Sequence, residues 1–263
     1  MATDPVQRPR PVPDPELRLF VAHHAGGSHV PYRSWAAHLP STWELCLLEA
    51  PGRNTRPGPL CTDARELAAT FLEDVLPWTD RPYAVFGHSM GAVAAYEMAL
   101  ELTARNLPLP RWLGLSALNP PEHHPRPYAR YDLPEAELRE AVLAMGGTPR
   151  EVLEHPEWWA LLEPMLRADL RLAEAWQPRA AQPLTVPMSV FVAGADPVAT
   201  PELADLWAAR STRFQRVHVL DGRHFYFQPD PALLIGRIVA DILGAARPGH
   251  GPGLVTGQQA AGS

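Results

Sequence analysis

The feature that most constrains the fold of this chain is a Gly-x-Ser-x-Gly run at residues 87–91. An apolar stretch at 83–86 precedes the run, and helix-forming residues follow it from 92 to about 105. This order of strand, tight turn and helix is typical of a nucleophile elbow, in which flanking glycines leave room for a serine at the tip of the turn. The sequence therefore predicts that Ser89 is a nucleophile held clear of the backbone. The alternative is a glycine-rich turn with an incidental serine.

A serine nucleophile needs a base, and the base needs an acid that orients it. In α/β-hydrolase folds these residues follow the serine in the order Asp or Glu, then His. Asp196 follows an expected strand over 188–193, and His224 follows an expected strand over 214–220. Because catalytic groups gather at the carboxyl ends of parallel strands, we expect Asp196 to be the acid and His224 the base.

Two other carboxylates compete with Asp196 for the role of the acid. Asp205 falls inside an expected helix that begins with Thr200 and a proline, and Asp221 fits a turn just before the histidine. The chain also has 11 histidines. We prefer His224 because it alone follows the last expected strand, and we expect the others to be structural or solvated.

The oxyanion hole of such a site takes two backbone N–H donors. One is expected from Met90, the residue after the nucleophile. The other is expected from the loop at 23–28, which follows an apolar strand over 18–22 and is rich in small residues. Ala25 is the first choice in that loop and Gly26 the second. The alternative for the loop is an ordinary glycine turn.

Expected strands and helices alternate along most of the chain. Besides the strands already named, residues 44–49 and 112–117 have the pattern of strands, while 63–76 and 230–244 have that of helices with one apolar side. Such alternation predicts an α/β fold with a mostly parallel sheet covered by helices on both faces.

The stretch over 120–179 interrupts this alternation because it contains no convincing strand. Its apolar residues, among them several tryptophans and methionines, are too many for a linker. We expect a helical insert that covers the active site as a lid, with one helix start near Asp132 and another in a capping box at 148–151. The alternative is a helical packing layer without a gating role.

Composition sets limits on the domain and its surroundings. The 263 residues, 46% of them hydrophobic, can build one large domain, expected at 17–243 between a proline-rich segment (1–16) and a disordered tail (244–263). A net charge of −6 argues against a nucleic-acid partner, and no apolar run is long enough to span a membrane. Two cysteines without metal-ligand spacing and the lack of a signal-peptide core favour a reducing, cytoplasmic location.

Seven short segments, in order, carry a family signal. They read His-Ala-Gly-Gly-Ser at 24–28, Tyr-Arg-Ser-Trp at 32–35, Pro-Gly-Arg at 51–53, Gly-His-Ser-Met-Gly-Ala at 87–92, Gly-Gly-Thr-Pro at 146–149, Leu-Arg-Ala-Asp at 166–169 and His-Phe at 224–225. Together they resemble the type II thioesterases of polyketide and nonribosomal peptide pathways, over about residues 17–243. The chain departs from that pattern at His23, where many relatives have proline, at Asp196, where relatives often have two acidic residues, and at Arg223, which replaces a glycine. None of these departures removes a catalytic atom.

The resemblance implies an α/β-hydrolase fold with a helical lid. It implies hydrolysis of acyl thioesters from the phosphopantetheine arm of acyl or peptidyl carrier proteins, which clears stalled or wrongly primed units, by a triad of Ser89, Asp196 and His224. No metal or other cofactor is expected, and the protein is expected to be a monomer. Two alternatives stay open: a serine esterase or lipase that acts on oxygen esters, and a non-hydrolytic binding module on the same fold.

Overall fold

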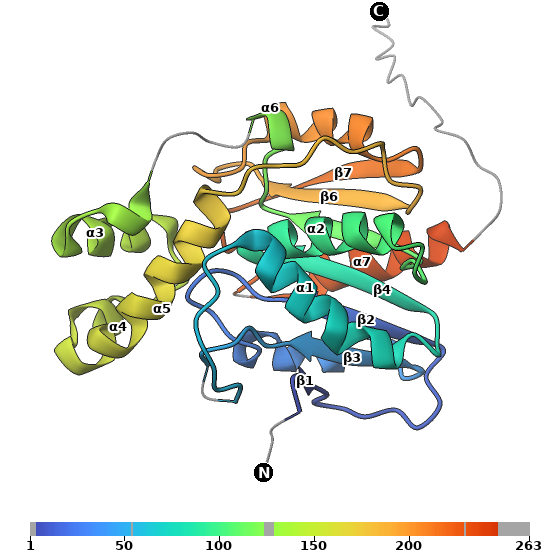
Figure 1. Cartoon of the computed structure of the whole chain (residues 1–263), viewed down its shortest axis with the longest axis horizontal. Helices are drawn as coiled ribbons and strands as arrows, with labels where there is room; N and C mark the ends of the chain where they lie inside the picture. The colour runs from blue at the N-terminus through green and yellow to red at the C-terminus, as the bar shows by residue number, and fades with distance from the viewer. Residues whose placement is uncertain (1–3, 54, 124–128, 229, 247–263) are drawn as a thin grey trace, which may run out of the picture.

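A seven-stranded sheet runs through the centre of the computed structural model, which describes residues 4–53, 55–123, 129–228 and 230–246 (Figure 1). The strands lie in the order β1-β3-β2-β4-β5-β6-β7, and every neighbouring pair is parallel except β1 with β3. This arrangement confirms the predicted α/β fold. The strands are β1 (Val6–Gln7), β2 (Leu17–Ala22), β3 (Trp43–Leu48), β4 (Tyr83–His88), β5 (Leu113–Ser116), β6 (Met188–Ala193) and β7 (Phe214–Leu220).

Helices cover both faces of the sheet, each through an apolar side. One face packs against α1, α2, α6 and η5, and the other against η1 and α7. Strands β2 to β6 are buried along their whole length, which explains why their sequences are nearly continuous apolar runs. None of the described helices is long and apolar enough to cross a membrane. The bounds are η1 (Val30–Ala37), α1 (Ala64–Val75), η2 (Leu76–Trp78), α2 (Met90–Ala104), α6 (Pro201–Ala204), η5 (Asp205–Arg210) and α7 (Ala232–Ala245).

Both ends of the predicted domain carry structure that the sequence analysis did not foresee. The short strand β1 lies within the proline-rich segment 1–16, where Val6 pairs with β3 at the edge of the sheet. A strand of two residues has no periodicity that a sequence could reveal. At the other end, α7 continues through Gly244 to Ala245 because this glycine does not adopt the positive φ of a helix-ending residue. The predicted tail therefore begins inside a helix, and its residues 247–263 lie outside the described part of the chain.

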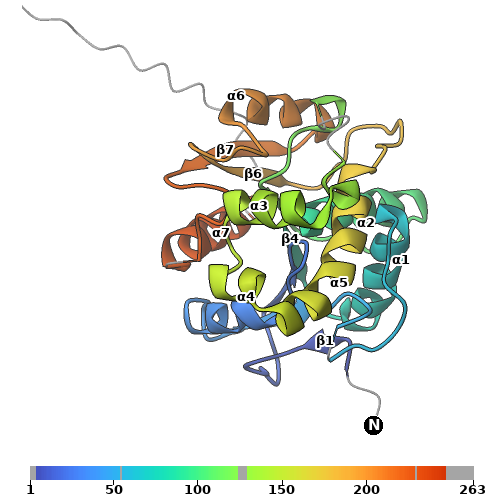
Figure 2. The ribbon, with the colours of Figure 1, turned by 90° about the vertical axis from the view of Figure 1, so that its left-hand side faces the viewer.

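In the described part of 120–179, helices joined by short loops are the regular elements, as predicted. Figure 2 looks onto one end of the sheet and shows α3, α4 and α5 lying across it. The predicted capping box is wrong, because Pro149 is extended with a ψ of 143° and α4 begins only at Arg150, without a side-chain cap from Thr148. The elements are η3 (Pro121–His123), η4 (Arg130–Asp132), α3 (Glu135–Met145), α4 (Arg150–Glu154) and α5 (Pro156–Glu174).

Candidate active site

Ser89 occupies the sharp turn between β4 and α2. Its backbone has φ 55° and ψ −116°, a combination that residues other than glycine rarely adopt and that stores strain. A Cβ on Gly87 would lie 2.1 Å from the carbonyl oxygen of Gly91, and one on Gly91 would lie 2.2 Å from the carbonyl oxygen of Ala22. Only glycine fits at either position, so the predicted strand–turn–helix geometry of the elbow is confirmed.

Asp196 and His224 form a buried pair at the carboxyl end of the sheet. Asp196 follows β6 and His224 follows β7, and His224 Nδ1 lies 3.1 and 2.9 Å from the two carboxylate oxygens of Asp196. The carboxylate also accepts the backbone N–H of Val198 at 2.8 Å, which fixes its orientation. A carboxylate beside Nδ1 favours the tautomer with the proton on that nitrogen, and this leaves Nε2 as a proton acceptor.

The two competing carboxylates do not reach this histidine. Asp205 and Asp221 are both exposed, whereas Asp196 is 5% exposed and His224 is 2% exposed. Contact with His224 therefore distinguishes Asp196 from both alternatives, including Asp221, which also follows a strand.

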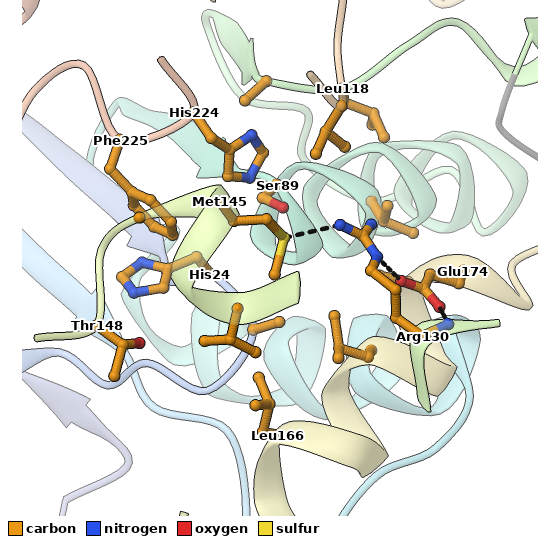
Figure 3. A pocket seen from close by; sticks show the side chains of 18 of the residues that line it. His24, Ser89, Leu118, Arg130, Met145, Thr148, Leu166, Glu174, His224 and Phe225 are labelled. Atoms are coloured by element: carbon orange, nitrogen blue, oxygen red, sulfur yellow. Dashed lines mark hydrogen bonds and ion pairs between the residues drawn. The ribbon is translucent and has the colours of Figure 1, made fainter. Parts of the chain in front are cut away.

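Ser89 and His224 line the same pocket, which lies beneath the helical insert. The pocket has a volume of about 740 Å³, a figure that includes the space at its open mouth. Figure 3 shows the Ser89 side chain next to the His224 ring, with Phe225 and His24 on one side and Met145 below Ser89 and His224 in this view. The hydrogen bonds of the described residues do not include one between the serine and the histidine. Such catalytic contacts are often long before substrate binds.

The loop after β2 meets the pocket at Ala25, where the second oxyanion donor was expected. The N–H of Gly26 donates to the Asp169 carboxylate at 2.8 Å, so this N–H is already engaged. Met90 is the first residue of α2, and the N–H groups of a helical first turn have no partner within the helix. The geometry therefore favours Ala25 over Gly26, and leaves Ala25 and Met90 as the pair of candidate donors.

A buried ion pair between Arg53 and Asp169 helps to hold the loops after β2 and β3 against α5. The sequence analysis did not foresee this pair. Arg53 follows β3 and Asp169 lies on α5, and the two side chains form an ion pair while only 3% and 2% exposed. Burial raises the pKa of Asp169, and the guanidinium of Arg53 opposes that rise. Arg53 also donates to the carbonyl oxygen of Pro51 at 2.9 Å. Both residues end segments that carry the family signal, at 51–53 and 166–169, but nothing in the sequence analysis indicated that the two side chains pair.

Two further histidines surround the base, and both are buried. The ring centroid of His88 lies 5.1 Å from that of His224, and its Nδ1 lies 2.7 Å from Ser116 Oγ. His24 lines the pocket, which the sequence analysis did not expect, and contacts Tyr32 through Nδ1 at 2.8 Å. Burial lowers the pKa of His88 well below its usual value and lowers the pKa of His24 to about 3. Both rings are therefore neutral near pH 7, and neither adds a charge beside the base.

The arginine that precedes the histidine points away from it. Arg223 is exposed and donates through Nη2 to the carbonyl oxygen of Ala144 at 2.9 Å. Ala144 lies in the last turn of α3, where unsatisfied carbonyl groups favour a cation. This departure from the family pattern thus links the histidine loop to the insert.

Comparison with known proteins finds a matching family model and thioesterases among the similar solved structures. A model of the thioesterase domain family matches residues 17–240. Linear gramicidin dehydrogenase LgrE of Brevibacillus parabrevis is 33% identical over 88% of this chain and 89% of its own length. The solved structure of RedJ, a thioesterase of the prodiginine pathway in Streptomyces coelicolor, is 31% identical with a TM-score of 0.79, covering 89% of this chain and 91% of RedJ. YbtT, a type II thioesterase of the yersiniabactin pathway, is 26% identical with a TM-score of 0.82, covering 92% of this chain and 99% of YbtT.

Proposed function

This chain belongs to the thioesterase domain family, and from that membership we propose that it hydrolyses acyl thioesters on the phosphopantetheine arm of carrier proteins. Similarity to type II thioesterases of polyketide and nonribosomal peptide pathways supports this substrate class. The observation that carries the mechanism is the buried Asp196–His224 pair, at 2.9 Å, beside a strained serine in one pocket.

In the proposed first step, Ser89 Oγ attacks the thioester carbonyl carbon while His224 Nε2 takes the hydroxyl proton. Asp196 holds the imidazole in the required tautomer and stabilises its positive charge. The electron pair of the carbonyl bond moves to oxygen, and the tetrahedral oxyanion accepts hydrogen bonds from the N–H groups of Met90 and Ala25. Each well-placed donor lowers the barrier by roughly 3 kcal/mol.

In the second step, the carbon–sulfur bond breaks and the pantetheine sulfur leaves with the proton from the imidazolium. Water then enters, His224 removes a proton from it, and the resulting attack on the acyl-enzyme ester repeats the same oxyanion chemistry. The proton returns to Ser89 Oγ as the carboxylic acid is released. These residues supply each proton transfer that hydrolysis needs, so the proposal includes no metal or other cofactor.

The neutral state of His24 and His88 supports the choice of His224 as the base. A cationic neighbour would oppose the imidazolium that forms in the transition state. Burial keeps the pKa of His24 at about 3, so its ring forms an uncharged wall of the pocket. Asp196 is then the carboxylate that stabilises the charge on His224.

The test is to compare the hydrolysis of acyl-carrier proteins with that of oxygen esters that carry the same acyl group. We expect a higher kcat/KM for the thioester, and labelling of Ser89 by a serine-directed phosphonate. A preference for the oxygen ester would favour the esterase or lipase alternative. No turnover and no labelling would favour a non-hydrolytic binding module.

A further inference from the structure

One ion pair interrupts the apolar wall of the pocket. Arg130 begins η4 and Glu174 ends α5, and both side chains line the pocket that holds Ser89. Figure 3 shows the pair across the pocket from His224, on the opposite side of Met145 from Phe225. The side chains of Arg130 and Glu174 are 15% and 7% exposed, so this is a nearly buried charge pair.

Both carboxylate oxygens of Glu174 accept hydrogen bonds from Arg130. One oxygen accepts the backbone N–H of Arg130 at 2.8 Å, and the other accepts Nε–H at 2.5 Å. Among the hydrogen bonds of the described residues, Nη1 has only the sulfur of Met145 as a partner. A thioether sulfur is a weak acceptor, so the outer edge of the guanidinium keeps donors without a strong acceptor.

Among the described residues, no hydrogen bond joins those donors to an oxygen atom of the pocket lining. Many of the lining residues are apolar, Val93, Leu118, Val142 and Leu170 among them, and the polar ones include Ser89, Asn119 and Thr148. No nitrogen of Arg130 is among the described buried atoms that lack a partner, so solvent can satisfy these donors before a ligand binds. A plain alkyl chain that displaces this solvent leaves the donors unpaired at a cost in free energy, and a ligand oxygen that supplies the acceptor avoids that cost. Apart from the candidate oxyanion hole, the donors of Arg130 are thus a position in the pocket that favours a ligand oxygen.

The charge balance decides which kind of oxygen fits. Glu174 already neutralises Arg130, and His24 is uncharged, so a carboxylate on the ligand would add a second negative charge that no cation balances. Burial also raises the pKa of Glu174, which reflects the cost of negative charge at this position. A neutral acceptor, such as a ketone or hydroxyl oxygen, takes the hydrogen bond without that cost.

We propose that Arg130 is a specificity-determining residue that selects acyl groups with a neutral oxygen substituent over plain alkyl chains and over chains that end in a carboxylate. This inference rests on the proposed thioesterase function and identifies the acyl class on which it acts. Glu174 is the positioning residue that holds the guanidinium and cancels its charge.

The first test measures kcat/KM for a matched series of pantetheine thioesters. The series contains octanoyl, its 3-, 5- and 7-oxo derivatives, and the derivative with a terminal carboxylate. The wild-type protein should prefer one oxo derivative over octanoyl by about 10-fold or more, the range expected for a hydrogen bond to a charged group. The carboxylate should be the poorest substrate. Equal rates for all five thioesters would overturn the inference.

The second test removes the charges one at a time. Glu174→Gln keeps an oxygen for Arg130 but leaves the guanidinium unneutralised, so the carboxylate thioester should gain at least about 10-fold relative to octanoyl. Adding Arg130→Met to Glu174→Gln removes the donors as well, and both the oxo and the carboxylate preferences should disappear. Glu154→Gln is the matched control, because Glu154 forms an exposed ion pair on α4 away from the pocket. Thermal melting of each variant checks that it folds.

The outcomes distinguish a failure of the Arg130 inference from a failure of the proposed thioesterase function. Amide-linked acyl pantetheines, which cannot be hydrolysed, bind without turnover, so the same series of acyl groups can be compared by affinity. Selective binding with the predicted order, lost in the double variant, supports the role of Arg130 even if thioester turnover is absent. Rapid turnover without discrimination, or a Glu174→Gln variant that still rejects the carboxylate, contradicts that role while leaving the hydrolase proposal intact.

Discussion

The pocket joins two regions that are held together in different ways. Its floor, with Ser89 and His224, lies on turns at the carboxyl end of the mostly parallel sheet, and backbone sterics determine the geometry of the Ser89 turn. Its roof consists of α3, α4 and α5, which contact the rest of the molecule through apolar packing by α5 and a few charged side chains. Asp169 joins α5 to Arg53 in the loop after β3 and to the N–H of Gly26 in the loop after β2. Arg179 joins the end of the insert to the buried Glu97 of α2. We therefore expect the chemistry to depend on the floor and the choice of substrate to depend on the roof.

The roof itself is not uniform. The C-terminal half of α5 carries Asp169 and Glu174, which bind other elements, and its buried leucines pack against the loop of Ala25. The first turns of α5 instead leave Trp158 and Leu161 exposed by 50% and 79%. The part of the insert expected to move as a lid is therefore α3, α4 and the start of α5, because these have fewer contacts with the rest of the molecule than the end of α5 has.

The largest expected effect lies in the floor. Ser89→Ala should reduce thioester turnover by roughly a million-fold, because the nucleophile is lost while the remainder of the site stays in place. The variant loses one oxygen atom, so its thermal melting should match that of the wild type. Near-normal hydrolysis by this variant would exclude Ser89 as the nucleophile.

A smaller effect is expected for the acid. Asp196→Asn should lower turnover by about four orders of magnitude, because an amide does not hold His224 in the tautomer that leaves Nε2 free. Asp221→Asn is the matched control, since Asp221 is exposed and lies three residues from the same histidine. If the control lost more activity than Asp196→Asn, the acid would be misassigned.

Loss of the ion pair between Arg53 and Asp169, which joins floor and roof, should have an intermediate effect on turnover and should also lower the free energy of unfolding. Asp169→Asn leaves the guanidinium of Arg53 buried without its counter-charge, which should destabilise the fold by about 3 kcal/mol or more. Glu163→Gln, on the same helix, breaks a half-exposed pair with Arg167 and should cost about 0.5 kcal/mol or less. Denaturant unfolding measures both values. Equal losses in the two variants would mean that the buried pair does not hold α5 in place.

The smallest effect concerns motion in the roof. Amide hydrogen exchange in the free protein should be faster in α3 and α4 than in the sheet, with the end of α5 closer to the sheet. A carrier protein that bears a non-hydrolysable acyl analogue should slow exchange in α3 and α4. Exchange that is equally slow in both states would indicate a fixed packing layer instead of a lid.

The sequence predicted the floor well, for a physical reason. Buried parallel strands need continuous apolar runs, so β4 and β6 were found as such runs, whereas the partly exposed β7 was found from its alternating sequence. The residues that follow these strands fell at the active end of the sheet. Asp196 was preferred by its position, but only the contact with His224 distinguishes it from Asp221. The Gly-x-Ser-x-Gly run predicted its own turn in part because Gly87 leaves room for the nearby backbone of Gly91, whereas Gly91 leaves room for Ala22, which is distant in sequence.

The sequence predicted the roof only in outline. The helical insert followed from a lack of strands, but the start of α4 depended on the conformation of Pro149, which the capping pattern did not determine. The contacts of Asp169 with Gly26 and Arg53 join residues more than 100 positions apart. No periodicity links such residues, so their pairing emerges only when the helix and the loop meet in the fold.

The most direct test of the central claim is to detect the covalent intermediate on Ser89. Rapid mixing of the protein with an acyl-carrier thioester, followed by acid quench and mass spectrometry, should reveal an increase equal to the acyl group. We expect peptide mapping to locate it on Ser89, and His224→Ala to prevent its formation. An acyl group on another residue, or thioester turnover in which Ser89 is never acylated under conditions that trap such intermediates, would contradict the account.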